Sequence, residues 1–320
     1  VGLADLSPER AKAALLRTGW EESGLSLESG SAGINAAAEK GRLAVTDDAR
    51  AVIQAEADII LEITGVPEAG AEHAWLAFEE QKDVVLVNVE ADCLVGPALK
   101  KKADQEGRIM SMAYGDQPAL IAEQVDWARA VGMEVVCAGK GTRYQPSYHY
   151  STPETVWGYY GFTEEQVAGG DFNPQMFNSF LDGTKSAVEM CALSNATGLK
   201  PQAEGLLFPP VGTGQLAEVL KPVQDGGILT ESGTVEVVAS EDRDEIPVQG
   251  DLRWGVYVVF KAPTEYARRC FREYGLATDS SGRYAALYRP SHLIGLELGI
   301  SVASVGLRRE PTGSSRSFLS

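Results

Sequence analysis

Hydrophobic and polar positions alternate in blocks along the first third of the chain, and these blocks predict strands separated by helices. Short runs rich in Val, Ile and Leu are typical of strands that are buried on both faces of a parallel sheet. The blocks between them carry helix signals, such as the N-cap serine, first-turn proline and acid of 7–9. We expect strands at 1–5, 43–46, 58–65, 84–88 and 109–112, and helices at 8–17, 48–55, 69–81 and 96–106.

Strands joined by helices of this length form right-handed crossovers and therefore a parallel sheet. The fold class predicted is α/β, a Rossmann-like doubly wound parallel sheet followed by an α+β domain. In such a sheet a Gly-rich turn after the first strand holds a dinucleotide pyrophosphate, and an acid ends the second strand. Because Asp5 ends the first predicted strand and no G-x-G-x-x-G precedes it, we expect a first strand and helix to be missing from this sequence. A complete domain with another sheet order is the alternative.

Two segments show no clear periodicity, 21–36 and 145–178, and we expect the first of them to be a mobile surface loop. The alternation of strands and helices changes after residue 113. A helix is predicted over 177–197, and the strands 234–239 and 254–260 suggest an antiparallel sheet. The predicted domains are 1–135 for nucleotide binding, 136–310 for catalysis and dimerisation, and 311–320 as a linker or tail.

Charge and composition exclude several classes of partner. The 320 residues include 28 Lys and Arg against 45 Asp and Glu, a net charge of −17. That charge disfavours nucleic acid and anionic membrane surfaces, and no apolar run reaches the roughly 18 residues of a membrane span. The 4 widely spaced cysteines favour reduced thiols in a cytoplasmic protein. An anionic small-molecule substrate would need a local cationic pocket.

Polar residues at the ends of predicted strands are the candidates for cofactor binding, because ligands of open parallel sheets bind there. Asp5 has the position of the acid that binds an adenosine ribose, although it could instead cap the next helix. An acid there favours NAD over NADP, but Arg10 could offset it, so NADP and NAD both stay open. We assign the same role to residues at later strand ends and turns: Thr64, Gly65, Asn88, Glu90 and Gly115.

A cluster of basic residues follows the strand at 135–138. Lys140 stands between two glycines, which let backbone approach a ligand closely, and a lysine there can contact a phosphate or a carbonyl. Arg143 and His149 follow and are candidates for substrate binding. The alternative is a surface loop with ordinary cations.

Asp182, Lys185 and Glu189 fall on one stripe of the helix predicted over 177–197. If the stripe faces a cleft, Asp182 and Lys185 can transfer protons and Glu189 can bind substrate; otherwise it is a solvated ion-pair face. Arg268, on a later helix, could reach a substrate phosphate or be an ordinary surface arginine. A rearranging reaction would also use a divalent metal, for which Glu90, Asp182 and Glu189 are weak candidates.

Six segments carry a resemblance to a known family. They are VNVEAD at 87–92, YGDQP at 114–118, AGKGTRY at 138–144, DLRWGVY at 251–257, APTEYARR at 262–269 and YAALYRP at 284–290. They resemble homoserine-dehydrogenase-like NAD(P)-dependent oxidoreductases with a SAF domain, a group that includes the deoxyxylulose-phosphate-reductoisomerase-like (DRL) enzymes of isoprenoid biosynthesis. The resemblance implies a Rossmann domain, a central catalytic domain and a homodimer formed through the sheet, for which 254–260 offers an apolar face.

Two departures argue against homoserine as the substrate. Homoserine dehydrogenases have Thr-Ala-Asn-Lys where this chain has Val-Asn-Val-Glu at 87–90, and their catalytic acid and lysine are four residues apart, whereas Asp182 and Lys185 are three apart. The resemblance therefore implies an oxidoreductase of a small hydroxy or keto compound, such as a phosphorylated sugar. Homoserine dehydrogenase remains an alternative enzyme, and an inactive nucleotide-sensing or assembly protein is the alternative outside catalysis.

Overall fold

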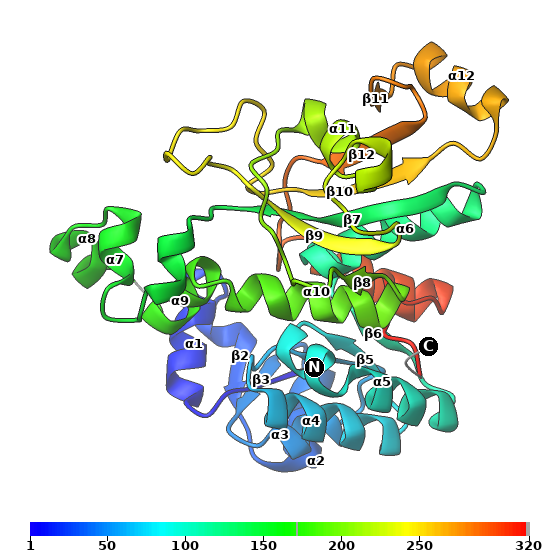
Figure 1. Ribbon diagram of the computed structural model, residues 1–320. Coiled ribbons are helices and arrows are strands. Elements are labelled where there is room, and N and C mark those ends of the chain that lie inside the picture. Colours follow the sequence, from blue (N-terminus) through cyan, green and yellow to red (C-terminus); the bar gives the residue numbers. More distant parts are fainter. Residues whose placement is uncertain (171, 318–320) are drawn as a thin grey trace. The chain divides into compact units, whose positions relative to one another are not determined.

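The computed structural model describes residues 1–170 and 172–317, and the chain divides into two compact units. Among the described residues, the first unit comprises Val1–Ala113 and 299–317, and the second comprises Tyr114–Leu298. Both units combine helices with sheets that contain parallel strands, so the predicted α/β class is confirmed (Figure 1). Within the part of the chain described, no helix is both long and apolar enough to cross a membrane.

The first unit contains two three-stranded parallel sheets, with strand orders β1-β3-β2 and β4-β5-β6. The strands are β1 (Gly2–Ala4), β2 (Leu25–Leu27), β3 (Leu43–Thr46), β4 (Ile59–Glu62), β5 (Asp83–Leu86) and β6 (Met110–Met112). The helices are α1 (Pro8–Arg17), α2 (Gly30–Glu39), α3 (Ala49–Ile53), α4 (Pro67–Glu79), α5 (Val89–Glu106) and α13 (Leu298–Ala303).

Each of these sheets has its own hydrophobic cluster. Helices α4 and α5 pack on the sheet of β4, β5 and β6, where Phe78 and Leu99 meet Val84. Helices α2 and α3 pack near β3, where Ile34 meets Ala44. Helix α3 contributes to both clusters, with Ile53 in the first and Ala51 in the second, and so connects them.

Residues 21–36 are ordered, so the expected mobile loop is wrong. They form a 3-10 turn at Glu22–Gly24, then β2 and the first turns of α2. Strand β2 pairs in parallel with β3, and Ile34 of α2 is fully buried. The helix was missed because alanines and glycines fill most of its length, and such small residues give a weak hydrophobic pattern.

The second unit is built on a six-stranded mixed sheet with the order β11-β12-β10-β7-β9-β8. The expected antiparallel pair of β9 and β10 is wrong, because β7 lies between them, parallel to β9 and antiparallel to β10. The strands are β7 (Glu134–Thr142), β8 (Lys200–Pro201), β9 (Thr234–Ala239), β10 (Val256–Lys261), β11 (Ala277–Thr278) and β12 (Tyr284–Arg289). The helices are α6 (Gln117–Ala130), α7 (Val156–Tyr160), α8 (Glu164–Gly169), α9 (Pro174–Leu181), α10 (Thr184–Thr197), α11 (Leu216–Val219) and α12 (Glu265–Glu273).

Both faces of this sheet are covered within the unit. Helices α6 and α10 pack on one face, with Leu120 and Leu193 against Val258. Helix α11 packs on the other face, with Leu216 against Tyr257. Strand β10 is therefore buried on both sides, and it cannot supply the free apolar face on which the sequence placed a dimer contact. Helix α6, which the sequence analysis put in the nucleotide-binding domain, packs on this sheet.

The helix predicted over 177–197 is two helices, α9 and α10, which are separated at Asp182 and Gly183. Gly183 adopts a left-handed backbone with φ of +90°, a conformation that favours glycine and ends the first helix. Asp182 is thus the C-cap of α9 and lies outside the helix that carries Lys185 and Glu189. The single stripe of three residues expected from the sequence does not exist.

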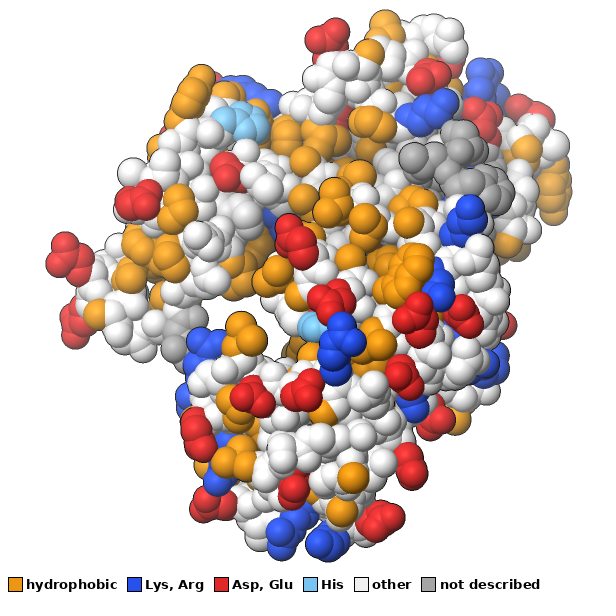
Figure 2. Space-filling view, turned by 90° about the horizontal axis from the view of Figure 1, so that it is seen from below, with side chains coloured by type: hydrophobic (Ala, Val, Ile, Leu, Met, Phe, Trp, Pro, Cys, Tyr) orange, Lys and Arg blue, Asp and Glu red, His pale blue; other side chains and the backbone are white. Residues whose placement is uncertain are grey.

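Charges of both signs are mixed on the surface. On the face shown in Figure 2, acidic and basic side chains are interspersed, with hydrophobic side chains between them. The net charge of −17 is therefore not gathered on that face into a single acidic expanse.

Candidate functional site

Lys140 lies within β7 and not in the loop that the sequence predicted. A Cβ atom at Gly139 would stand 1.7 Å from the carbonyl oxygen of Glu236, and one at Gly141 would stand 1.9 Å from that of Leu252. The two glycines are therefore required because this chain's own backbone comes close on both sides of Lys140. They do not form an open turn for a ligand, which is how the sequence was interpreted.

The Lys140 side chain points to the face of the sheet that α6 and α10 cover. Its Nζ donates to Oε1 of Gln117, at 2.8 Å, and forms an ion pair with Glu189. Lys140 is 5% exposed and Glu189 is 4% exposed. A strand, the first turn of α6 and the middle of α10 therefore meet at one buried ion pair. The sequence predicted Lys140 and Glu189 as site residues, and the structure brings them together.

Asp116 stands beside this ion pair as the N-cap of α6, and its Oδ1 accepts from the backbone N–H of Gln117 at 2.8 Å. Burial, with the negative charge of Glu189 second, raises the pKa of Asp116 to about 7. The positive charges of Lys185 and Lys140 act in the opposite direction but do not cancel the rise. Asp116 is therefore an acid that changes protonation near neutral pH, a property typical of groups that transfer protons.

We call these five residues the Lys140 cluster: Asp116, Gln117, Lys140, Lys185 and Glu189. It combines two lysines, which can stabilise a negative oxygen, with a carboxyl group that titrates near neutrality. Asp116 and Gln117 were not among the residues proposed from the sequence. Their signal was present, since an N-cap acid two residues before a proline, shortly after a predicted strand, lies where ligands of α/β folds are bound.

Asp182 and His149 lie together at a different place in the second unit. His149 Nδ1 donates to the backbone carbonyl of Asp182 at 2.8 Å. The Asp182 carboxylate accepts from Asn178 Nδ2 at 3.0 Å and from the backbone N–H of Thr184 at 2.8 Å. Both residues line a cavity of about 600 Å³ with mainly apolar walls, and no member of the Lys140 cluster lines that cavity. The predicted catalytic residues thus fall into two groups.

The two predicted substrate-binding arginines both have carboxylate partners. Arg143 pairs with Glu241 at 2.9 Å and also donates to the carbonyl of Tyr159 at 2.8 Å. Arg268 pairs with Glu265 of its own helix at 3.1 Å. Each guanidinium charge is therefore offset locally, and the cationic pocket expected for an anionic substrate is weaker than the sequence suggested.

Three predicted cofactor residues lie after strands of the first unit, where an open sheet binds ligands. Asp5 follows β1, accepts from the backbone N–H of Ser7 at 2.8 Å and keeps 35% of its side chain exposed, so it can still meet a ribose hydroxyl. Asn88 follows β5 and donates to Thr64 Oγ1 at 3.2 Å and to the carbonyl of Val66 at 2.9 Å. Asn88 and Thr64 therefore tie the ends of β4 and β5 to one another.

For each of the remaining predicted cofactor residues, local structure explains why that residue type stands at its position. Gly65 follows β4 with φ of +68°. Glu90 is an acid in the first turn of α5, where the helix dipole favours it. Gly115 has φ of +95°, and a Cβ there would stand 2.9 Å from the carbonyl oxygen of Leu293, so it permits a close approach of chain within the second unit.

The residues of the first unit fit a nicotinamide dinucleotide in part. Asp5 suits the ribose, but among residues 1–113 no strand-to-helix turn carries the G-x-G-x-x-G that donates N–H groups to a pyrophosphate. A metal is not supported: nowhere in 1–170 and 172–317 do three His, Cys, Asp or Glu side chains gather to hold one. Asp182 and Glu189, two of the weak metal candidates, have Asn178 and Lys140 as partners instead.

Comparisons with solved structures give remote likenesses. An aldose-aldose oxidoreductase from Caulobacter crescentus is 14% identical, with 98% of this chain and 83% of that chain covered and a TM-score of 0.41. A probable dehydrogenase from Thermotoga maritima is 11% identical, with 97% and 82% covered and a TM-score of 0.41. Among curated proteins, none matches significantly.

The comparison with protein families is decisive because it covers more than half of the chain. Residues 115–298 match the family described as oxidoreductase DRL, catalytic domain. The match takes in almost all of the second unit and all of the Lys140 cluster. The chain therefore belongs to the DRL oxidoreductase family, and its second unit is the catalytic domain of that family.

Proposed function

We propose that this protein is an NAD(P)-dependent oxidoreductase that acts on a small hydroxy or keto compound at the Lys140 cluster. The observation that carries the proposal is the meeting of β7, α6 and α10 at a buried Lys140–Glu189 ion pair beside Asp116. Keeping two ionised groups out of water is costly, and groups so placed are typical of functional sites.

Carbonyl reduction and alcohol oxidation require a protein to stabilise charge on the substrate oxygen and to transfer a proton, and the Lys140 cluster has residues for both. Lys185 and Lys140 would stabilise the negative charge that develops on the substrate oxygen. Asp116 would give a proton to that oxygen during reduction and take it back during oxidation, for which a pKa of about 7 is well matched. A bound nicotinamide would supply or accept the hydride, and Asp5 would contact its ribose.

The phosphorylated sugar implied by the resemblance is the first substrate class to test. Lys140, Arg143 and Arg268 are each paired with a carboxylate, so a phosphate would gain less from them than the sequence suggested. Lys185 contributes positive charge at Asp116 and would be a further cationic contact. A reductoisomerase reaction on a phosphorylated sugar is one of the reactions that the proposal includes.

The test is a panel of hydroxy and keto compounds, with and without phosphate groups, measured with NADH and NADPH by nicotinamide absorbance. Turnover that is lost in Lys185→Ala and kept in Lys200→Ala supports the proposal, because Lys200 is an exposed lysine of the same unit outside the cluster. Cofactor binding without turnover across the panel would favour the inactive nucleotide-sensing protein instead.

A further inference from the structure

The second unit contains a cavity of about 600 Å³ that the Lys140 cluster does not use. Its walls come from α10, from β8 and β9 and from the segment 205–208, and every described residue that lines it belongs to the second unit. Apolar side chains make up most of the wall: Ala187, Met190, Cys191, Pro201, Leu206, Phe208 and Val235. A space of this size, with apolar walls and few polar groups, is typical of sites that bind small organic molecules.

The charge of the cavity is negative. Asp182, between α9 and α10, is the one carboxylate among the described residues that line it, and none of those residues is a lysine or an arginine. His149 has partners at both ring nitrogens, the carbonyl of Asp182 at 2.8 Å and Tyr144 Oη at 3.1 Å, so it contributes its ring to the wall. The cavity therefore combines one carboxylate with apolar and aromatic surface.

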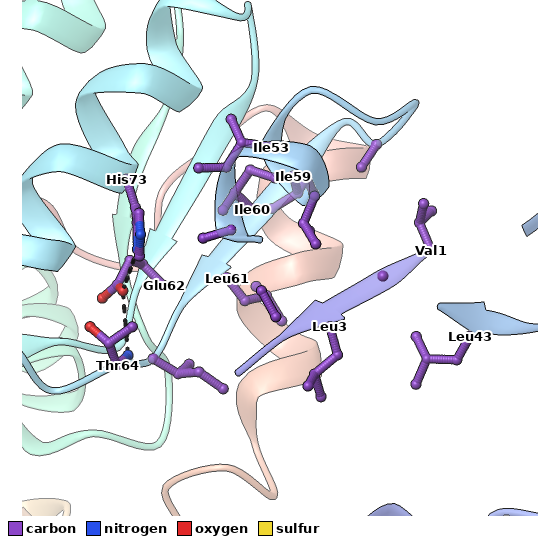
Figure 3. A pocket seen from close by; sticks show the side chains of 16 residues that line it. Val1, Leu3, Leu43, Ile53, Ile59, Ile60, Leu61, Glu62, Thr64 and His73 are labelled. Atoms are coloured by element: carbon purple, nitrogen blue, oxygen red, sulfur yellow. Dashed lines mark hydrogen bonds and ion pairs between the residues drawn. The ribbon is translucent and has the colours of Figure 1, made fainter. Parts of the chain in front are cut away.

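The Asp182 carboxylate has capacity left for a ligand. Its oxygens accept one hydrogen bond each, from Asn178 Nδ2 and from the backbone N–H of Thr184, whereas an ionised carboxylate can accept about four. Both donors are neutral amides, and neither offsets the charge of Asp182. By contrast, the carboxylate in the apolar cavity of the first unit, Glu62, accepts from an ionisable side chain, with His73 Nδ1 at 3.2 Å (Figure 3). A cationic donor is therefore the group that suits Asp182.

The aromatic wall of the cavity is held in a strained conformation. Phe208 has φ of +50°, a left-handed backbone that bulky residues rarely adopt. The N–H groups of Leu207 and Phe208 donate to Oε1 of the fully buried Glu236 at 2.9 and 3.3 Å, and Arg243 donates to the carbonyls of the same two residues. The Phe208 ring stacks on Tyr144 with centroids 4.1 Å apart. Such strain persists where surrounding groups fix it, and it is typical of residues at ligand sites.

The cavity and the Lys140 cluster lie on different sides of α10. Two residues turn a helix by about 200°, so Ala187 and Cys191, which line the cavity, face away from Lys185 and Glu189. A ligand in the cavity is therefore separate from a substrate at the Lys140 cluster.

We propose that this cavity binds a small organic cation, an ammonium group carried on an aromatic body, at a site separate from that of the oxidoreductase substrate. The ammonium group would donate to Asp182, and the aromatic body would pack against Met190, Leu206 and the ring of Phe208. A phosphate or carboxylate would be repelled by Asp182 and would find no lysine or arginine among the described residues of the wall.

The test is a panel of matched compounds added to the full chain. Phenyl, indolyl and naphthyl rings each carry an ethylamine, an ethanol or an acetate group, so that the ring is constant while the charge changes. Binding is measured from the methyl resonances of Met190 and Leu206, two residues of the wall. At least one amine should shift both resonances and bind at least about tenfold more tightly than its alcohol, because a hydrogen bond between charged groups is the stronger one. The acids should leave both resonances unchanged.

Two substitutions separate the charge of the cavity from its space. Asp182→Asn removes the charge at nearly constant size, so it should weaken the amine by about tenfold or more and leave the alcohol unchanged. Ala187→Phe places a ring in the cavity and should abolish binding of both compounds, whereas Ala130→Phe, at the exposed end of α6, is the matched control and should bind as the unmodified protein does.

The cavity also contains a chemical reporter. Cys191 is exposed and lines the cavity, so the bound amine should slow its alkylation and leave that of Cys270, on α12, unchanged. The proposal is overturned if no amine of the panel shifts Met190 and Leu206 up to its solubility limit. Equal affinity for an amine and its matched acid, or amine binding that survives both Asp182→Asn and Ala187→Phe, would also overturn it.

Discussion

At the scale of single residues, Asp116 is the group whose behaviour the structure defines most sharply. Its pKa is raised to about 7 by burial and by Glu189, so the folded protein holds a proton that the unfolded chain releases near pH 4. The contribution to stability is complete below pH 4 and is lost as the pH rises toward 7.

We predict that the free energy of unfolding falls between pH 4 and pH 7 and that Asp116→Asn removes part of this fall. Three pKa units correspond to at most about 4 kcal/mol. Asparagine is also a good N-cap, so α6 should be retained. Urea unfolding of both proteins across this pH range is the measurement. Identical pH dependence would show that Asp116 has an ordinary pKa.

The Lys140–Glu189 pair gives a second prediction at this scale. Lys140→Met should lower the free energy of unfolding by roughly 3–5 kcal/mol, because Glu189 stays buried without its partner charge. The double variant with Glu189→Gln should recover much of that loss. Denaturant unfolding of the two single variants and the double variant measures the coupling. Additive losses would mean that the two side chains do not interact.

At the scale of elements, the sequence predicted most strands and helices of the first unit. For two of them, the predicted bounds are the same as those in the structure. Helix α1 and strand β3 have strong signals, a Ser-Pro-Glu start and an apolar run respectively. The failures have physical causes. The glycines on either side of Lys140 suggest a loop, whereas close backbone packing requires both of them inside β7. The break between α9 and α10 depends on the left-handed backbone of Gly183, which helical periodicity does not reveal.

The site was predictable only where residues are close in sequence or share one pattern. Lys140, Lys185 and Glu189 were proposed from charge and spacing, but Asp116 was not, because its raised pKa depends on α6 and α10 packing on the same sheet. Asp182 was grouped with Lys185 by helical spacing, which fails where a helix ends.

Helix α5 provides an element-scale prediction. A Cβ at Gly96 would stand 2.0 Å from Asp92 Oδ1 and 2.6 Å from Ser315 Oγ, so Gly96→Ala must displace buried groups. We expect a loss of about 1–3 kcal/mol in the free energy of unfolding. Gly158→Ala in α7, where nothing lies within 4 Å, is the matched control and should be neutral or stabilising. A stabilised Gly96→Ala variant would show that the contact of α5 with Ser315 is absent.

At the scale of the whole molecule, the family resemblance leads us to predict a homodimer. The interface cannot use residues 256–260, because β10 is buried on both faces. Exposed apolar residues of the neighbouring strand β12, Leu287 and Tyr288, are the alternative surface. Light scattering at micromolar concentration should give twice the 34.2 kDa mass of the chain. A monomer that is unchanged by Leu287→Asp would count against the dimer.

The central claim is that the Lys140 cluster is the active site of this oxidoreductase. The most direct test is steady-state kinetics of Lys185→Ala and Lys200→Ala with the best substrate from the nicotinamide panel. A lysine that acts on developing charge contributes about 2–4 kcal/mol of barrier, so kcat should fall roughly 30- to 1000-fold in Lys185→Ala, with a smaller change in KM. Lys200→Ala should match the unmodified protein. Equal kcat in all three proteins would contradict the account and place the chemistry outside the cluster.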